Sequence, residues 1–189
     1  MPRVPRAFLD ASVLYPVSLR NLLMRLALAG LFQARWSADV HREWMRAVLR
    51  DHPHIPAERL ERLRVAMDLH AEGALVVGYD VLIPTLKLPD DNDRHVLAAA
   101  IVGDVDLIVT HNLRDFPGGL LDVHGIEAIH PDIFVSDLIG RSPERVVAAV
   151  RDQQAVLRNP PVAMDDLLLL FERLGLIQAS AALRRLLDR

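Results

Sequence analysis

The chain has 189 residues, of which 51% are hydrophobic, with no cysteine and a formal net charge of −3. This length suits one domain, or one domain with a small appendage, and the hydrophobic fraction allows a sizeable core. The lack of cysteine excludes disulfides, thiolate zinc sites and cysteine nucleophiles. The small negative charge excludes a global positive field that would attract nucleic acid.

No stretch of the sequence resembles a membrane span or a targeting segment. The first ten residues are too short and too polar for a signal peptide. The longest apolar runs, over 22–32 and 167–171, are interrupted or flanked by charged residues, and both fall short of the roughly 20 residues that span a bilayer. We therefore expect a soluble cytoplasmic protein with no membrane segment.

The first part of the chain alternates predicted strands with predicted helices. Short apolar or β-branched runs predict strands over residues 7–9, 31–36, 74–77 and 106–110. Capping residues and helical spacing predict helices over residues 18–29, 37–50, 56–71 and 89–101. This alternation predicts an α/β fold in which helices cover both faces of a parallel sheet.

The character of the chain changes after Pro131. The remaining pattern predicts only helices, over residues 133–140, 142–157 and 165–187, with a break at Asn159-Pro160-Pro161. We therefore predict a first domain over residues 1–140 and a helical C-terminal extension over residues 141–189.

Acidic residues follow two of the predicted strands. Asp10 ends the first strand directly, and Asp115 lies in the loop after the strand over 106–110. Because ligands of parallel α/β sheets bind at the C-terminal ends of the strands, both acids are candidates for a functional site. Each also has a structural alternative, since Asp10 could cap the next element and Asp115 could shape a turn before Pro117.

Two more acids lie on predicted helices, on the side expected to be buried. Glu43 is three residues after Val40 and shares its apolar face, and Asp93 precedes Val96 by three. A buried carboxylate costs several kcal/mol unless it is paired or binds a metal. The alternatives are a buried arginine partner for Glu43 and a capping box for Asp93 with Asp90 as N-cap.

These four acids could converge on one pocket at the edge of the sheet. Their mutual repulsion makes such a pocket reasonable only with a cation. Because all the ligands would be oxygen atoms, a hard ion such as Mg²⁺ or Mn²⁺ is expected. Such an ion binds phosphate oxygens and activates water, which predicts phosphodiester hydrolysis.

Four segments, in order, resemble the motifs of the PIN-domain family, and in particular of VapC-like ribonuclease toxins. They are residues 8–14 (FLDASVL), Trp36-Ser37 with Glu43, residues 89–100 (PDDNDRHVLAAA) and residues 106–116 (DLIVTHNLRDF). The stretch from Ser142 onward more weakly resembles the helical C-terminal extension of some VapC-like toxins.

The resemblance implies a three-layer PIN sandwich with a central parallel sheet, a divalent metal and cleavage of RNA. It also implies a cognate antitoxin as partner and a homodimer. Its catalytic and metal-binding acids carry over to Asp10, Glu43, Asp93 and Asp115, and its auxiliary polar positions to Asp90, Thr110 and Asn112. No role carries over to His111, and the other histidines considered, His52, His54, His124 and His130, are predicted to lie at the surface.

Three other functions compete with a ribonuclease toxin. A phosphatase of the haloacid dehalogenase type would need an acid two residues after Asp10, where this chain has Ser12. A non-catalytic binding module of the PIN fold would be expected to have lost an acid. The sequence does not exclude a housekeeping PIN nuclease that processes RNA. A small antitoxin-like reading frame beside the gene would favour a toxin over this alternative.

Overall fold

A computed structural model describes residues 3–158 and 160–188. Its centre is a five-stranded, all-parallel sheet with the strand order β3-β2-β1-β4-β5. The strands are β1 (Arg6–Leu9), β2 (Gln33–Ser37), β3 (Leu75–Val76), β4 (Leu107–Val109) and β5 (Glu127–Ile129). In the centre of the sheet, Phe8 of β1 pairs with Arg35 of β2 and with Ile108 of β4. The predicted parallel sheet is confirmed, and β5 is an additional strand that the sequence pattern did not predict.

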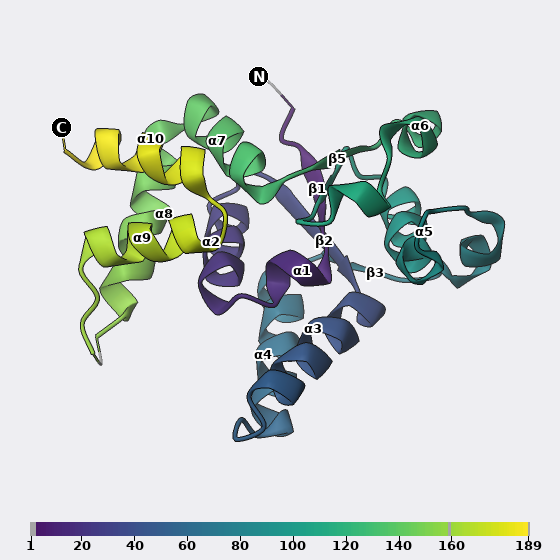
Figure 1. Ribbon diagram of the computed structural model, residues 1–189, viewed down its shortest axis with the longest axis horizontal. Helices are drawn as coiled ribbons and strands as arrows, with labels where there is room; N and C mark the ends of the chain where they lie inside the picture. Colours follow the sequence, from purple (N-terminus) through teal and green to yellow (C-terminus); the bar gives the residue numbers. More distant parts are fainter. Residues whose placement is uncertain (1–2, 159, 189) are drawn as a thin grey trace.

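The helices of the first part are α1 (Ala11–Leu14), α2 (Val17–Leu28), α3 (Ala38–Asp51), α4 (Ala57–His70), α5 (Arg94–Val102) and α6 (Gly118–Leu121). Short 3₁₀ turns are η1 (Asp80–Thr85), η2 (Asp91–Asp93), η3 (Leu113–Asp115) and η4 (Asp122–His124). The last part contains α7 (Pro131–Arg141), α8 (Pro143–Val156), α9 (Met164–Arg173) and α10 (Ile177–Leu187). Figure 1 shows α2 and the four last helices on one side of the sheet and α5 on the other. The three-layer sandwich with a helical extension is therefore confirmed.

Local sequence signals explain where two of the helices begin or end. Ser37 is the N-cap of α3, and its hydroxyl accepts the backbone N–H of Val40 at 3.2 Å, as predicted. Gly30 follows α2 with a φ of +67°, a conformation that glycine adopts without strain. The expected cap at Ser18 is wrong, because α2 begins at Val17 after Pro16.

The last four helices share one hydrophobic core with the sheet. The rings of Phe32 and Phe134 meet edge to face, with centroids 4.9 Å apart. On α8, which packs against α2, the Gln153 side chain donates a hydrogen bond of 2.9 Å to the carbonyl oxygen of Ser18. Since α7 packs against both α8 and α10, the boundary at residue 140 falls inside a packed unit and stays a prediction.

The single helix predicted over 165–187 is wrong. The chain turns at 174–176 between α9 and α10, and Gly175 adopts a φ of +89° there. In this left-handed region a residue with a Cβ is strained, so the glycine ends α9. The break predicted at 159–161 agrees with the end of α8 at Val156 and the start of α9 at Met164, although Asn159 lies outside the described residues.

Within residues 3–158 and 160–188, none of the helices combines the length and the apolar character needed to cross a membrane.

Candidate active site

Asp10 occupies the C-terminal end of β1, where four hydrogen-bond donors hold its carboxylate, among them the backbone N–H of Ser12 at 3.4 Å from Oδ2. The backbone N–H of Ala11 donates to Oδ1 at 2.7 Å, and the hydroxyls of Ser12 and Thr110 donate to Oδ2 at 2.7 and 2.8 Å. The side chain is 5% exposed. Asp10 is also the N-cap of α1, so the structural alternative is correct without excluding a functional role.

Thr110 and Ser12 join the ends of β1 and β4 around this carboxylate. The buried Thr110 hydroxyl accepts the backbone N–H of Asn112 at 3.0 Å, and the Ser12 hydroxyl accepts the backbone N–H of His111 at 3.1 Å. Because β1 and β4 run parallel, their C-terminal ends meet at one edge of the sheet. Ser12 was not predicted as a site residue, although its place two residues after a strand-end aspartate was a usable signal.

Asp93 is half-buried at the start of α5 and is the most perturbed acid of the site. Burial, and then the nearby charges of Asp10, Asp115, Asp90 and Glu43, raise its pKa to about 6. In the part of the chain that the structure describes, no hydrogen bond reaches its carboxylate, so the capping-box alternative finds no support. Five carboxylates, contributed by four segments of the chain, therefore lie close enough for their charges to interact.

Glu43 lies at the rim of this neighbourhood and does not point into the core. Its side chain is 43% exposed, so the predicted inward orientation is wrong. Its partner is His95, whose Nε2 lies 2.8 Å from the Glu43 carboxylate, and not a buried arginine. The buried Arg20 instead donates to the carbonyl of Leu14 and covers the Trp44 ring at 4.7 Å.

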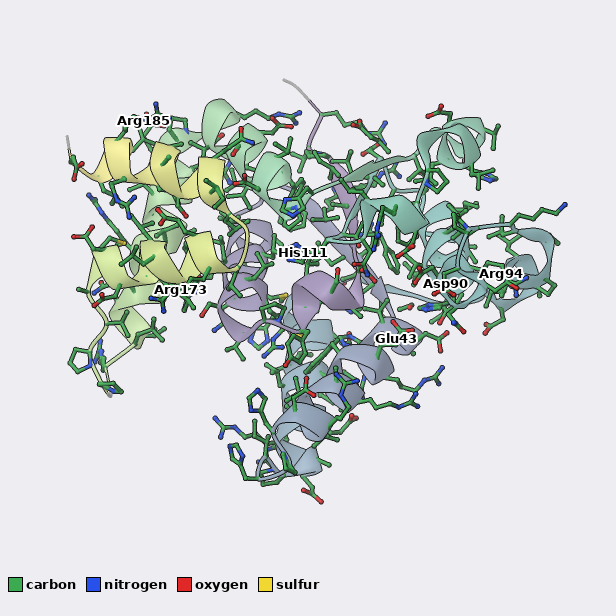
Figure 2. The ribbon with its side chains drawn as sticks, in the orientation of Figure 1. Glu43, Asp90, Arg94, His111, Arg173 and Arg185 are labelled. Carbon is green, nitrogen blue, oxygen red and sulfur yellow. The ribbon has the colours of Figure 1, made fainter. Side chains whose placement is uncertain are left out.

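Asp115 and Asp90 complete the set of acids. Asp115 ends η3, half-buried, where its backbone N–H donates to the carbonyl of Asn112 at 3.0 Å. Its role in the turn before Pro117 is therefore compatible with a role in the site. Asp90 is exposed and caps η2 by accepting the backbone N–H of Asn92 at 2.8 Å. In the view of Figure 2, Glu43 and Asp90 border the acidic neighbourhood from α3 and from the turn before α5.

The chemistry of these donors fits a hard divalent cation, because they are all carboxylates gathered at one edge of the sheet. Their charges act together on Asp93, yet among the described residues no three metal-binding side chains stand close enough to share one ion. Both observations are consistent, since charges interact over about 10 Å whereas metal ligands must lie within about 2.5 Å of the ion. Binding would require the acids to draw together.

Comparison with known proteins agrees with this arrangement. The family described as "PIN domain" matches residues 6–114, more than half of the chain. This chain belongs to the PIN-domain family. A second family, the "VapC50 C-terminal domain", matches residues 131–185, so the PIN domain carries a VapC-like C-terminal extension.

One similar protein is named "Putative ribonuclease VapC50" and comes from Mycobacterium tuberculosis (strain ATCC 25618 / H37Rv). It is 36% identical to this PIN protein over 95 residues, which cover 50% of this chain and 56% of the relative. The match thus spans little more than half the length of that relative. No solved structure matches the chain significantly.

A pair of histidines borders the acids of the PIN domain. Nδ1 of His111 lies 3.1 Å from Nε2 of His130, and both rings are half-buried. Burial, and then the neighbouring His130, lower the pKa of His111, whereas Asp10 acts in the opposite sense. The predicted surface position is therefore wrong for His130, although it is confirmed for His52, His54 and His124.

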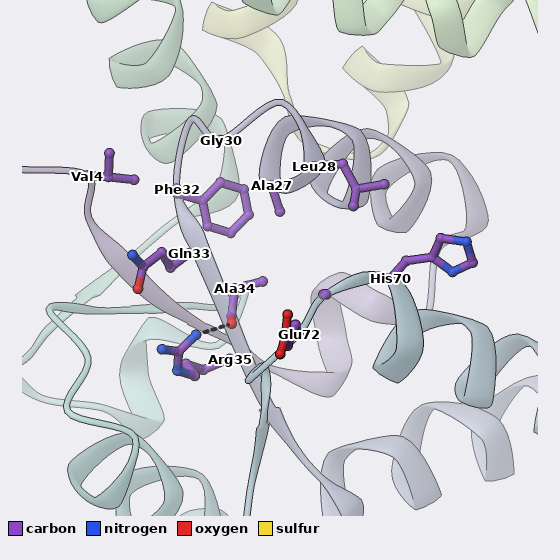
Figure 3. Close-up of a pocket in the computed structure, with 11 residues that line it drawn as sticks. Val4, Ala27, Leu28, Gly30, Phe32, Gln33, Ala34, Arg35, His70 and Glu72 are labelled. Carbon is purple, nitrogen blue, oxygen red and sulfur yellow. Dashed lines mark hydrogen bonds between the residues drawn. The ribbon is translucent and has the colours of Figure 1, made fainter.

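A separate hollow of the PIN domain, of about 570 Å³, lies away from the acids (Figure 3). Its lining includes residues at or just before the starts of three strands. Val4 precedes β1, Phe32 and Gln33 lie at the start of β2, and Glu72 precedes β3. The hollow therefore lies at the N-terminal edge of the sheet. Ligands of such sheets bind at the opposite edge, so we assign the site to the acids.

Proposed function

We propose that this PIN protein is a metal-dependent endoribonuclease that hydrolyses phosphodiester bonds of RNA. The single observation that carries the proposal is the gathering of carboxylates from four segments at the C-terminal edge of the parallel sheet, where burial and the neighbouring charges raise the pKa of Asp93. Holding such charges together destabilises the folded protein. A nuclease site needs this arrangement, because the acids together bind a divalent cation. The resemblance of the 95-residue segment to a relative named as a ribonuclease also supports it.

Asp10, Asp93 and Asp115 would hold the cation, with Glu43 beside it and Asp90, Thr110 and Asn112 as auxiliary residues. Bound Mg²⁺ or Mn²⁺ supplies charge neutralisation at the phosphate and an activated water. The chain's own contribution is orientation, because two hydroxyls and two backbone N–H groups fix the Asp10 carboxylate before any ligand arrives. In the hydrolysis, a water oxygen bonds to phosphorus while the bond to one bridging oxygen breaks, and that oxygen leaves with a proton.

The raised pKa of Asp93, about 6, describes the site without a cation. Bound cation would lower this pKa, since a positive charge favours the carboxylate. The Glu43 carboxylate is paired with His95, so it can turn toward the other acids only by releasing that histidine.

We further propose that the protein is the toxin of a toxin–antitoxin pair, acts in the cytoplasm and forms a homodimer. The VapC-like extension over 131–185 supports this proposal. A housekeeping RNA-processing nuclease is the alternative. Co-expression with the product of any small neighbouring reading frame distinguishes the two. If that product binds the protein and inhibits cleavage, the protein is a toxin. If it does not bind, the toxin proposal is contradicted.

The test of cleavage uses the purified full chain, a generic single-stranded RNA and titrated Mg²⁺ or Mn²⁺. Cleavage should require the cation, stop with a chelator and be lost in Asp93→Asn. The matched control is Asp91→Asn, which removes an exposed acid from the same turn, where it pairs with Arg94. Full activity in excess chelator, or wild-type activity in Asp93→Asn, would contradict the proposed mechanism.

A further inference from the structure

A line of hydrogen bonds connects the backbone of α7 with Asp10, one member of the acidic cluster formed by Asp10, Glu43, Asp90, Asp93 and Asp115. The N–H of Asp132 donates to Nδ1 of His130 at 3.2 Å, and Nε2 of His130 lies 3.1 Å from Nδ1 of His111. The backbone N–H of His111 then donates to the Ser12 hydroxyl, which itself donates to the Asp10 carboxylate. Three segments distant in sequence thus meet around His111.

The first bond in this line decides the protonation of both rings. A backbone N–H can only donate, so Nδ1 of His130 has no proton and its Nε2 carries one. That Nε2–H donates to His111, whose Nδ1 must therefore be the acceptor. In a neutral imidazole the remaining proton lies on the other nitrogen, so His111 carries its hydrogen on Nε2.

Nε2 of His111 is available to a ligand. None of the hydrogen bonds within residues 3–158 and 160–188 uses this atom, and it is not among their buried polar atoms without a partner. This atom therefore keeps some solvent exposure. His111 feels the charge of Asp10, and Figure 2 shows it beside α1, across from Glu43 and Asp90.

The C-terminal extension packs against this histidine pair at Gly175. At Gly175, a Cβ would lie 3.5 Å from Cε1 of His130 and 3.7 Å from Cε1 of His111. The turn is held in place because the Asp132 carboxylate accepts the backbone N–H groups of Gln178 and Ala179 at 3.1 and 2.9 Å. The start of α10 therefore positions the residues that define the His111 tautomer.

We propose that His111 donates a hydrogen bond from Nε2 to a phosphate oxygen of the RNA, and that His130 and the α9–α10 turn act as positioning elements for this donor. The inference rests on the proposed ribonuclease function. It adds a substrate contact beside Ser12 and Asp10. It also gives the extension a defined part in substrate binding.

The first test reads the tautomers directly, without any RNA. Long-range ¹H–¹⁵N spectra of the full-length protein at neutral pH should show both His111 and His130 protonated on Nε2, with assignments from His111→Gln and His130→Phe. In His130→Phe, the His111 signal should shift toward a mixture of tautomers. A wild-type His111 protonated on Nδ1 would overturn the inference.

The second test measures kcat and KM for cleavage of one RNA by matched variants. His111→Phe keeps a flat ring without a donor and should lower kcat/KM roughly ten- to a hundredfold, the effect of losing one hydrogen bond to a charged oxygen. His111→Gln places an amide N–H close to the position of Nε2 and should recover part of the loss. His124→Phe, at an exposed histidine, should have no effect.

Each outcome separates the inference from the function on which it rests. Loss in His111→Phe with recovery in His111→Gln supports the donor. Wild-type rates in His111→Phe, or an equal loss in both variants, would overturn it while metal-dependent cleavage stands. A wild-type protein that cleaves no RNA would overturn the proposed function itself, and the substrate contact with it.

Discussion

The two sides of the acidic cluster differ in how the protein holds their carboxylates. On the strand side, Asp10 is buried and accepts hydrogen bonds from Ala11, Ser12 and Thr110. On the helix side, Asp93 receives no hydrogen bond from the described residues, and burial and the neighbouring carboxylates raise its pKa. The difference shows that one carboxylate is fixed by the fold, whereas the other is left to the repulsion of its neighbours, which a bound cation would relieve.

The largest effect should come from removing the fixed carboxylate. Asp10→Asn should reduce cleavage by at least about three orders of magnitude, as for groups that act as a unit in other active sites. The amide nitrogen of the asparagine cannot accept the hydrogen bonds that the Asp10 carboxylate accepts, so the variant should also have a lower melting temperature. Asp93→Asn should abolish cleavage too, yet raise the melting temperature of the metal-free protein. Equal shifts in melting temperature for the two variants would contradict the comparison.

A smaller effect should follow from removing one hydroxyl on the strand side. Thr110→Val keeps the shape of the side chain but loses the donor to Asp10. Outer-shell groups of this kind typically contribute about ten- to a hundredfold to metal affinity or activity, so cleavage should fall by that factor and need more Mg²⁺. Thr85→Val, at an exposed threonine of η1, is the matched control. An unchanged Mg²⁺ dependence in Thr110→Val would show that orientation of Asp10 does not matter.

The helix side should make stability depend on pH. The pKa of Asp93 is raised from 3.8 to about 6 in the folded protein, so the folded state binds the extra proton between these values. The metal-free protein should therefore lose stability as pH rises from 4 to 6, by about 1 kcal/mol after allowance for solvent screening. Denaturant unfolding across this range measures the loss. Asp93→Asn should flatten this part of the profile, and an unchanged slope would refute the assignment to Asp93.

The smallest effect is expected at the rim. His95→Gln removes the partner of Glu43 in a pair whose histidine is mostly buried and whose glutamate is partly exposed. Because the carboxylate reaches solvent, we expect the pair to contribute about 1 kcal/mol or less. Stability should change little, while cleavage should change severalfold if Glu43 is freed toward the pocket. Stability by chemical denaturation and the cleavage rate are measured together. A large loss of stability with unchanged cleavage would make His95 purely structural.

The sequence predicted the strand side of the site better than the helix side. Asp10 and Thr110 end strongly apolar strands, and parallel strands must bring such ends to one edge. Glu43 was misplaced because it follows Val40 by three positions, which puts it at the margin of the apolar stripe and not at its centre. At such a margin the neighbouring element decides the orientation, and here His95 holds the carboxylate outward.

The histidine pair and the turn at Gly175 could not be predicted, because both depend on distant contacts. β5 has only three residues, too few for a recognisable pattern, so nothing in the sequence indicated that His130 lies beside His111. In the extension, apolar spacing continues across Gly175 and favours one helix. The left-handed turn at Gly175 instead lets α10 fold back onto α7, with which it packs extensively.

The central position of β1 also determines when during synthesis the cleavage centre can form. β1 is made early but pairs with β4, and the Asp10 carboxylate is completed by Thr110, a hundred residues later in the chain. Contacts that span so much sequence close late, after most of the chain has left the ribosome. If the chain has the proposed ribonuclease activity, its site stays incomplete until β4 has emerged and joined the sheet, so the nascent chain would not expose its own messenger RNA to a finished site before that point.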